Sequence, residues 1–351
     1  MLKRLKLSNF TVFPDLDLTF SRGLNIVVGE NGAGKSHLLK LSYVLSFTSS
    51  AMGKATRQGK DDWQKRLADK LVATCRPDYL GRLVSRSQGR NRCEVQVSFM
   101  APVGSSFKFS FATNSRSEVK METVPTTCLA AQPVFIPTRE MLSIFPGFVA
   151  AYEDRQLEFD ETYYDLAKAL GGAAKKKHTA QVQALISTLE NLMDGHIRQE
   201  GGRFYLLPNK AGVGKIEIPL LAEGIRKLGM LAYLLINGAL RNSGTLFWDE
   251  PETNLNPKLM VVTARALFGL AQQGYQVVLA THSLFLLREL EILQAQTKAA
   301  VPARYIGLSL NDEDVRVEQA NDVTQIQTLV LLDEELHQTD RYLALDGVVE
   351  K

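Results

Sequence analysis

The chain has 351 residues, 45% of them hydrophobic and 23% charged, which suffices for one large domain or two medium ones with real cores. A formal net charge of +3 excludes neither nucleic acid nor protein as a partner. No apolar run approaches the roughly 20 residues of a membrane span, and no signal-peptide pattern opens the chain, so we expect no membrane partner. Cys75, Cys93 and Cys128 lack CxxC spacing, so we expect neither a zinc site nor disulfides and place the protein in the cytoplasm.

Residues 1–50 are predicted to form the first lobe of an α/β domain. Apolar alternation and a following helical pattern are the signals for this. The expected elements are strands at residues 1–7, 16–20 and 23–28, and a helix at residues 36–45.

Residues 51–214 are predicted to be an insertion between two halves of that domain. It opens with a basic helical segment, because Lys and Arg far outnumber Asp and Glu over residues 54–92. The further expected elements are a hairpin at residues 93–100 and 106–113, a strand at 134–136, helices at 155–170 and 179–192, and a hairpin at 196–207 and 215–220.

Residues 215–310 are predicted to form the second lobe, and residues 311–351 a helical tail. No long heptad run is present, so we expect no coiled-coil arm. The expected elements are a helix at residues 224–240, buried strands at 245–248 and 276–280 with a helix at 257–272 between them, strands at 304–310 and 315–319 paired across 311–314, and a helix at 323–343.

The sequence GENGAGKS at residues 29–36 matches the phosphate-binding pattern GxxxxGK[ST] between an apolar strand and a helix. Glycines let backbone N–H groups turn toward phosphate oxygens, and the helix adds its N-terminal dipole. Lys35 is expected to reach the β- and γ-phosphates of ATP, and the Ser36 hydroxyl to bind Mg²⁺. His37 follows Ser36 and is more typical of a helix surface. The nucleotide-binding candidates are Glu30, Asn31, Gly32, Ala33, Gly34, Lys35, Ser36 and His37.

Two acids end the apolar strand at residues 245–248. Burying carboxylates at a strand end is unfavourable unless a cation lies nearby. We expect Asp249 to hold Mg²⁺ and Glu250, one residue further, to polarise a water for attack on the γ-phosphate. The alternative is a strand followed by an acidic turn, which the phosphate loop makes less favourable.

The next apolar strand, residues 276–280, runs into Thr281 and His282. A lone histidine is usually structural, but ligands of parallel α/β sheets bind at the carboxyl ends of the strands. We therefore expect His282 to contact the γ-phosphate, with a neutral imidazole as hydrogen-bond donor.

The order of phosphate loop, Asp-Glu strand and Thr-His-Ser resembles the ABC-class ATPases, and within them the RecF, SMC and OLD branch. The Asn-Phe pair at residues 9–10, the wording of the phosphate loop and the DEPETNLNP run at residues 249–257 carry the resemblance. It covers about residues 1–50 and 215–310. It implies an α/β fold: a P-loop NTPase with an ABC-type head, a mixed sheet and a helical and β-hairpin insertion.

That branch carries a signature loop at a helix start, which reaches the γ-phosphate held by the other subunit. The resemblance places this loop at Ala222, Glu223 and Gly224, with Asn254 at the subunit seam. Relatives have serine where Ala222 stands, and the missing hydroxyl removes a bond of about 1.5–3 kcal/mol. Other departures are the absence of a clear glutamine switch loop, for which residues 137–140 are the nearest candidate, and Thr11 in place of a basic residue.

The resemblance thus implies a homodimer or larger assembly built around ATP, in which Glu250, His282 and Lys35 are the catalytic candidates and Ser36 and Asp249 hold Mg²⁺. ATP joins the subunits and hydrolysis separates them.

The basic segment at residues 54–92, together with residues 175–177, either binds nucleic-acid phosphate or is a solvated helical surface, and the sequence leaves both open. We see no ordered set of stacking aromatics.

OLD nucleases carry a metal-dependent nuclease domain after the ATPase, and no such constellation is seen here. Asp312, Glu313 and Asp314 are better explained as a hairpin turn. We therefore expect a separate effector such as a nuclease, as in the stand-alone ATPases of anti-phage operons such as Septu and PARIS. The alternatives are a RecF-like DNA repair or replication ATPase, the ATPase subunit of a membrane transporter and, more remotely, a small-molecule kinase.

Overall fold

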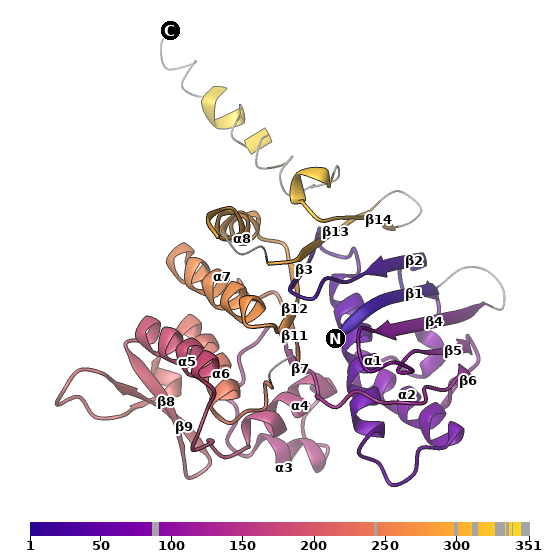
Figure 1. Cartoon of the computed structure of the whole chain (residues 1–351), viewed down its shortest axis with the longest axis horizontal. Coiled ribbons are helices and arrows are strands. Elements are labelled where there is room, and N and C mark those ends of the chain that lie inside the picture. The colour runs from indigo at the N-terminus through magenta and orange to yellow at the C-terminus, as the bar shows by residue number, and fades with distance from the viewer. Residues whose placement is uncertain are drawn as a thin grey trace.

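The structure is a computed structural model of the whole chain, and its two ends and main layers are visible in Figure 1. It describes residues 1–85, 91–241, 244–297, 301–310, 315–326, 334, 337–338, 340 and 341–344. The predicted turn at residues 311–314, with Asp312, Glu313 and Asp314, lies outside these residues, as do ten of the 21 residues of the predicted tail helix at residues 323–343. Of that tail, residues Val323–Gln325 (η3) form a short 3-10 turn.

A six-stranded sheet in the order β14-β13-β3-β12-β11-β7 forms the centre of the molecule. All neighbouring strands are parallel except β14, which pairs antiparallel with β13. The sheet is therefore mixed, as predicted. Its strands are β3 (Leu24–Gly29), β7 (Val134–Ile136), β11 (Thr245–Asp249), β12 (Gln276–Thr281), β13 (Ala303–Leu310) and β14 (Val315–Ala320).

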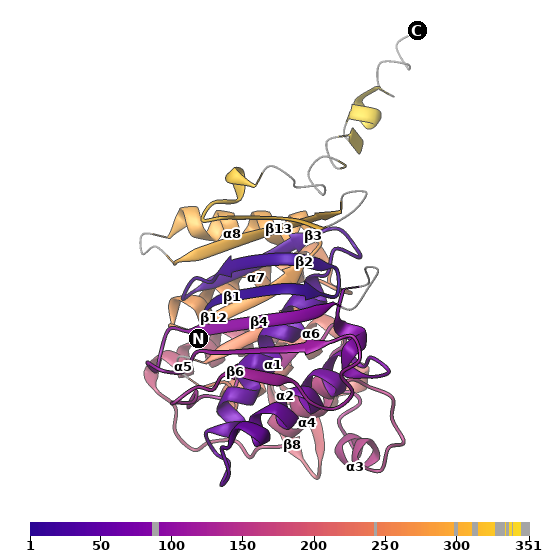
Figure 2. The ribbon, with the colours of Figure 1, turned by 90° about the vertical axis from the view of Figure 1, so that its right-hand side faces the viewer.

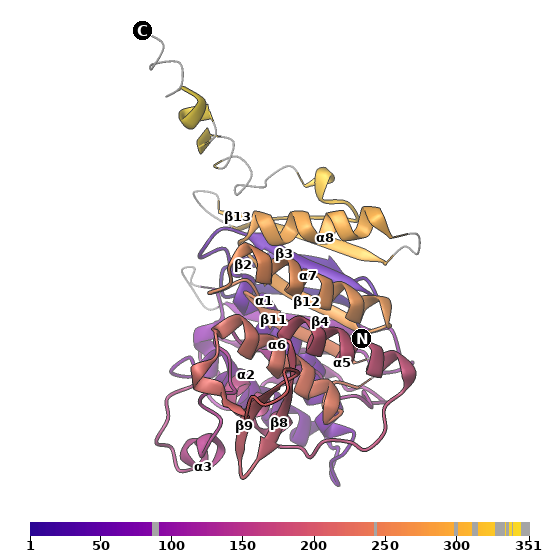
Figure 3. The ribbon, with the colours of Figure 1, turned by 90° about the vertical axis from the view of Figure 1, so that its left-hand side faces the viewer.

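Both faces of this sheet are covered, which explains why β3 is apolar except for the buried Asn25. Leu24, Ile26 and Val28 join the core under one set of helices, whereas Val27 joins the core on the opposite face. A strand buried on both sides cannot alternate with polar residues, which is typical of parallel sheets. Figure 3 shows α7 and α8 lying across one face.

The opposite face carries α1, and beyond it lies a five-stranded antiparallel sheet in the order β2-β1-β4-β5-β6, seen face-on in Figure 2. The predicted hairpin at residues 93–100 and 106–113 is confirmed as β4 and β5. β6 was not predicted, because four residues carry too little periodicity. The strands are β1 (Leu2–Phe10), β2 (Phe13–Thr19), β4 (Arg92–Phe99), β5 (Phe107–Ala112) and β6 (Lys120–Thr123).

Among the described residues, no helix has the length and apolar character needed to cross a membrane. Side-chain caps start several of the helices: Asp160, Thr179, Asn256 and Ser283 each accept a bond from the first turn. The helices are α1 (Lys35–Met52), α2 (Lys60–Cys75), α3 (Phe148–Glu153), α4 (Glu161–Leu170), α5 (Ala180–Met193), α6 (Glu223–Ile236), α7 (Pro257–Gln272) and α8 (Leu284–Gln296), with 3-10 turns η1 (Leu80–Leu83) and η2 (Ile218–Leu220).

Two sequence predictions in the insertion are wrong. Residues 196–207 are not one strand but parts of two, β8 (Gly195–Glu200) and β9 (Arg203–Pro208). Gly201 and Gly202 both have positive φ and turn the chain between them. β10 (Ile216–Glu217) pairs with β9. The helix predicted at residues 155–170 begins later, because Asp160 caps α4.

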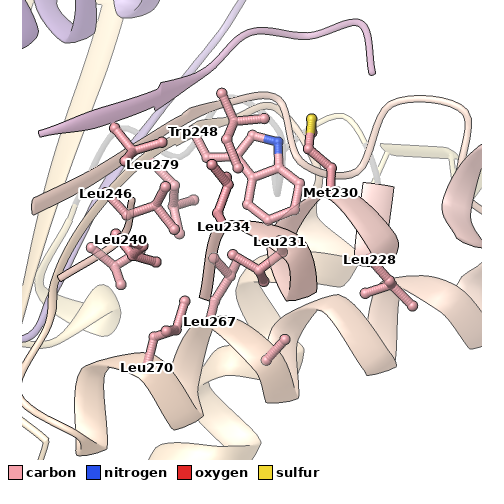
Figure 4. Close-up of a cluster of buried hydrophobic side chains, with 14 of the residues drawn as sticks. Leu228, Met230, Leu231, Leu234, Leu240, Leu246, Trp248, Leu267, Leu270 and Leu279 are labelled. Atoms are coloured by element: carbon pink, nitrogen blue, oxygen red, sulfur yellow. The ribbon is translucent and has the colours of Figure 1, made fainter. Parts of the chain in front are cut away.

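A cluster of buried apolar side chains fixes β11 beneath α6 and α7 (Figure 4). Leu246 and Trp248 of β11 face Leu231 and Leu234 of α6 and Leu267 of α7 in this cluster. Truncating one of these leucines to alanine typically costs 2–5 kcal/mol. The same packing holds Asp249, the last residue of β11, at the carboxyl end of the sheet.

Candidate functional site

The phosphate loop connects β3 to α1 at the carboxyl edge of the central sheet. Gly32 and Gly34 have φ of +87° and +90°, which L side chains rarely adopt. A Cβ at Gly34 would also lie 2.6 Å from Val12 Cγ2, in the turn between β1 and β2, and 2.7 Å from Phe13 Cζ, at the start of β2. Both the backbone conformation and the available space therefore require glycine at residue 34.

Lys35 turns back over this loop. Its Nζ donates to the carbonyl oxygens of Gly29 (2.8 Å) and Glu30 (2.9 Å). Burial lowers its pKa, and the nearby carboxylates of Glu250 and Asp249 oppose that shift. Among the described residues this buried ammonium donates hydrogen bonds to backbone carbonyls alone, so it can pair with phosphate oxygens.

Asp249 and Ser36 meet beside the loop. Burial raises the pKa of Asp249 to about 6, and a hydrogen bond from Ser36 opposes this rise. Asp249 Oδ1 is buried and has no hydrogen-bond partner in the described part of the chain. An orphaned carboxylate oxygen next to a serine hydroxyl fits a hard divalent cation, so these residues suit Mg²⁺.

Glu250 and His282 lie together at the ends of β11 and β12. His282 Nδ1 is 3.3 Å from Glu250 Oε1 and 3.5 Å from Glu252 Oε1. Glu250 adopts a φ of 49°, its N–H donates to the Ala280 carbonyl (2.9 Å), and it accepts from the Thr253 hydroxyl (3.2 Å). A positive φ at a non-glycine residue marks a conformation that its surroundings impose, as is common at functional sites.

Glu252 is a site residue that our sequence reasoning did not single out. It is buried, and its Oε1 accepts from the Thr281 hydroxyl (2.6 Å) and the His282 backbone N–H (3.0 Å). It thereby joins the end of β11 to the end of β12. The second glutamate of the Glu-Pro-Glu run was the available signal.

The position of His282 changes what its ring can do. If Nδ1–H points at the two acids, a neutral ring has only an acceptor at Nε2. Donation to a phosphate oxygen from Nε2 then requires the imidazolium form, whereas the neutral donor expected from the sequence requires the proton on Nε2, and the neutral donor stays a prediction.

The remaining loop residues are more open. Asn31 and Gly32 are exposed and Ala33 is buried, while Glu30 Oε1 accepts from the Leu310 N–H (2.9 Å) at the end of β13. His37 lies in the first turn of α1, and burial, then Lys40, lowers its pKa. Its side chain makes no hydrogen bond among the described residues, so its role in nucleotide binding stays a prediction.

The candidate signature loop stands at the start of α6. Ala222 is the N-cap and offers no side-chain cap. Gly224 packs against α7, since a Cβ there would lie 2.5 Å from Leu259 Cδ1. Asn254 Nδ2 donates to Glu223 Oε2 (3.0 Å), so the candidate seam residue touches the candidate signature loop.

The buried Lys227 and the partly buried Arg226 attach α6 to the site. Lys227 Nζ donates to the Thr253 carbonyl (2.7 Å), and Arg226 pairs with Glu140 at 3.2 Å. Glu140 belongs to residues 137–140, the candidate switch loop after β7. In the described contacts, Glu223 and Gly224 do not touch residues 29–36 of the same chain.

Two family models match the chain. One, described as "AAA domain", covers residues 4–194, more than half of the chain. The other, described as "AAA domain, putative AbiEii toxin, Type IV TA system", covers residues 144–288.

Shorter stretches are similar to the DNA replication and repair protein RecF. In Limosilactobacillus fermentum (strain NBRC 3956 / LMG 18251) the identity is 34% over 102 residues, 28% of this chain and 23% of RecF. In Streptococcus suis (strain 05ZYH33) it is 43% over 60 residues, 17% of this chain and 16% of RecF. The chain matches less than a quarter of the length of these relatives.

Solved structures of SMC heads share the fold. A SmcHead bound to the C-winged helix domain of ScpA aligns with a TM-score of 0.53 and 14% identity over 93% of this chain and 99% of that chain. An Smc head with an extended coiled coil, bound to the C-terminal domain of ScpA from Pyrococcus furiosus, gives 0.51 and 12% over 96% and 99%. The predicted fold class, an α/β ABC-type ATPase head, is thereby confirmed.

Proposed function

The chain belongs to the AAA-domain family, and from this premise we propose that it binds and hydrolyses ATP as an ATP-bridged dimer that controls a separate effector protein. The observation that carries the proposal is the meeting of Lys35, Ser36 and Asp249 at the phosphate loop with an orphaned carboxylate oxygen between them. We take residues 1–50 and 215–310 as the two lobes of this ATPase, residues 51–214 as its insertion and residues 311–351 as its tail.

In this proposal each side chain has a distinct task. Lys35 releases its two backbone carbonyls and pairs with the β- and γ-phosphates, while Ser36 and Asp249 hold Mg²⁺. Bound there, Mg²⁺ supplies charge neutralisation to the phosphate oxygens. Glu250 orients the attacking water and accepts its proton, and His282, held beside Glu250 and Glu252, contacts the γ-phosphate.

The contacts around the signature loop support a site shared between two subunits. Glu223 and Gly224 form the N-terminus of a 14-residue helix, where backbone N–H groups and the helix dipole favour an anion. Their own phosphate loop is not their neighbour in the described contacts, so the anion they meet belongs to a second copy. Asn254, which bonds Glu223, then lies at the seam.

Mixing two inactive variants tests the shared site. Lys35→Ala removes the phosphate ligand, and Ala222→Glu places a negative charge at an exposed helix start where it repels phosphate without disturbing the helix. In a mixed dimer one of the two sites regains both intact halves, so an equal mixture should recover about a quarter of wild-type hydrolysis. An Ala222→Gln control keeps the size without the charge. A mixture that stays inactive contradicts the shared site.

We propose a nuclease of anti-phage defence as the separate effector, and two similarities support control of a separate effector. The family model over residues 144–288 is described by a toxin of a type IV toxin–antitoxin system, and both SMC heads above were solved bound to another protein. Co-purification of the Glu250→Gln variant with ATP from its native host, followed by identification of bound proteins, tests this. Recovery of the ATPase alone in both nucleotide states contradicts it.

A RecF-like role in DNA repair or replication is the second candidate, and the local identity to RecF favours it. Such a protein binds duplex DNA itself. Binding by the purified chain that weakens steeply with salt supports this candidate over effector control.

A further inference from the structure

Two basic segments that are far apart in the sequence line one cavity in the structure. The cavity has a volume of about 600 Å³ and lies among the C-terminal half of α1, the length of α4, the start of β7 and the turn after α6. Lys54 and Arg66 come from the basic segment at residues 54–92, and Lys175 comes from the lysine run at residues 175–177. The fold thus brings basic side chains from distant parts of the sequence to one cavity.

Cations outnumber acids around this cavity. Five basic side chains line it, against the two acids Glu161 and Asp165. Both acids form ion pairs with Lys70, which does not itself line the cavity; Lys70 Nζ lies 2.9 Å from Glu161 Oε2. The Tyr43 hydroxyl also donates to Asp165 (2.7 Å). The five basic residues are Lys54, Arg66, Lys168, Lys175 and Arg241.

These five side chains keep their charge available. None of them forms an ion pair with an acid in the described part of the chain; Lys54 bonds the Gln132 amide (3.2 Å) and Lys168 the Tyr164 hydroxyl (3.0 Å). Unpaired cations gathered around one hollow create a positive potential that attracts anions, since low-dielectric walls focus the field.

Lys175 is held in place by its backbone and by contact of its side chain with Gly238. Its backbone N–H donates to the Ile236 carbonyl (3.0 Å), and its ammonium lies against Gly238. Gly238 has a φ of +70°, and a Cβ there would collide with Lys175 Nζ. The turn after α6 therefore leaves room for this ammonium at the cavity wall.

The cavity is separate from the ATP site. α1 begins at Lys35 in the phosphate loop and ends at Met52, two residues before Lys54. Its 18 residues span about 27 Å. α6 likewise begins at the candidate signature loop and ends next to Asn237, which lines the cavity. The two sites thus occupy opposite ends of the same helices.

We propose that this cavity binds the phosphate groups of a nucleotide-class ligand, either a free nucleotide or the phosphorylated end of a nucleic-acid strand. Its volume falls in the range of small-ligand sites, and its arginine and lysine side chains are the usual partners of phosphate. Five cations exceed what one phosphate needs, so the ligand carries several. This site adds to the proposed ATPase function and does not depend on it.

The test uses the full chain carrying Lys35→Ala, in which the ATP site is disabled. The probe is a 3′-fluorescein oligothymidylate with a 5′-phosphate, and fluorescence anisotropy measures its binding at several salt concentrations. The same oligonucleotide with a 5′-hydroxyl is the control probe, and ADP is the competitor. The test variant adds Lys175→Gln and Arg241→Gln. The matched control adds Lys176→Gln and Lys210→Gln, which remove the same charge from exposed residues outside the cavity.

The test variant should bind at least about tenfold more weakly and lower the salt slope by about 1.4, whereas the control should change affinity less than about twofold. Displacement by ADP identifies a free nucleotide as the ligand, and binding of the oligonucleotide without displacement identifies a strand. Absence of binding by either probe, or equal loss in the test and control variants, overturns the proposal. Because the chain used cannot hydrolyse ATP, failure here leaves the ATPase proposal untouched.

Discussion

Replacing Asp249 with asparagine should make the nucleotide-free protein more stable while abolishing its Mg²⁺-dependent activity. Asp249 lies at the end of β11 with an orphaned carboxylate oxygen, and burial is the largest influence on its pKa. A buried carboxylate with one oxygen lacking a hydrogen-bond partner destabilises the fold, and it is retained because a cation is needed there. Asparagine keeps the shape and removes the charge.

The magnitude follows from the pKa, which rises from 3.8 to about 6 on folding. One unit corresponds to about 1.4 kcal/mol, so ionising Asp249 costs about 3 kcal/mol more in the folded protein than in the unfolded chain. Between these two pKa values the folded state binds more protons, so the contribution of Asp249 to stability is full at low pH and is lost as pH rises through about 6.

Urea unfolding without nucleotide or metal measures this directly. Near pH 7.5 the Asp249→Asn variant should exceed the wild type by up to about 3 kcal/mol, and near pH 3.5 the difference should vanish. Saturating Mg²⁺ and ATP should stabilise the wild type and not the variant. Asp15→Asn, at an exposed residue of β2, is the control and should show little change.

A variant that is less stable than the wild type near neutral pH, or equally different at both pH values, would refute the reasoning. At Mg²⁺ and ATP concentrations well below saturation, where most of the wild-type protein is metal-free, protonation of Asp249 should reduce hydrolysis as pH falls below about 6, by at most tenfold per unit, because protons compete with Mg²⁺ for the carboxylate.

Two further predictions concern α6. Ala222→Ser supplies the missing N-cap and the hydroxyl that the resemblance expects. It should stabilise the protein by about 1 kcal/mol in urea unfolding and tighten ATP-dependent dimers about tenfold or more in light scattering. Dimers no tighter than those of the wild type would show that residue 222 does not reach the nucleotide. Glu140→Gln leaves Arg226 without its acid and should cost about 3 kcal/mol, whereas the double variant with Arg226→Met should recover most of it; strictly additive losses in this cycle would show that the pair is not coupled.

The parts of the site that were predicted from sequence are those carried by local pattern. The phosphate loop and the Asp-Glu strand end each combine an apolar strand with fixed neighbours, so Lys35, Ser36, Asp249 and Glu250 were identified without knowledge of the fold. Strand order in a parallel sheet then brings residues 29–36, 249 and 282 to one edge, which the structure bears out.

What escaped prediction depends on contacts between distant segments. Glu252 acts through Thr281 and His282, about thirty residues later in the chain, and its neighbours in sequence do not reveal this. Lys70 was counted with the basic surface, yet it is buried between Glu161 and Asp165 and is unavailable to nucleic acid. The hairpin between β8 and β9 was missed although Gly201 and Gly202 marked its turn, because alternation on both sides was read as continuous.

The central claim is that ATP joins two copies of this chain and that Glu250 drives their separation. We would measure the solution mass of the wild type and of Glu250→Gln by light scattering, with and without Mg²⁺ and ATP, alongside phosphate release. The account predicts that the glutamine variant gains mass only with ATP and no longer releases phosphate. Unchanged mass together with continued hydrolysis would contradict both the role of Glu250 and the ATP-bridged dimer.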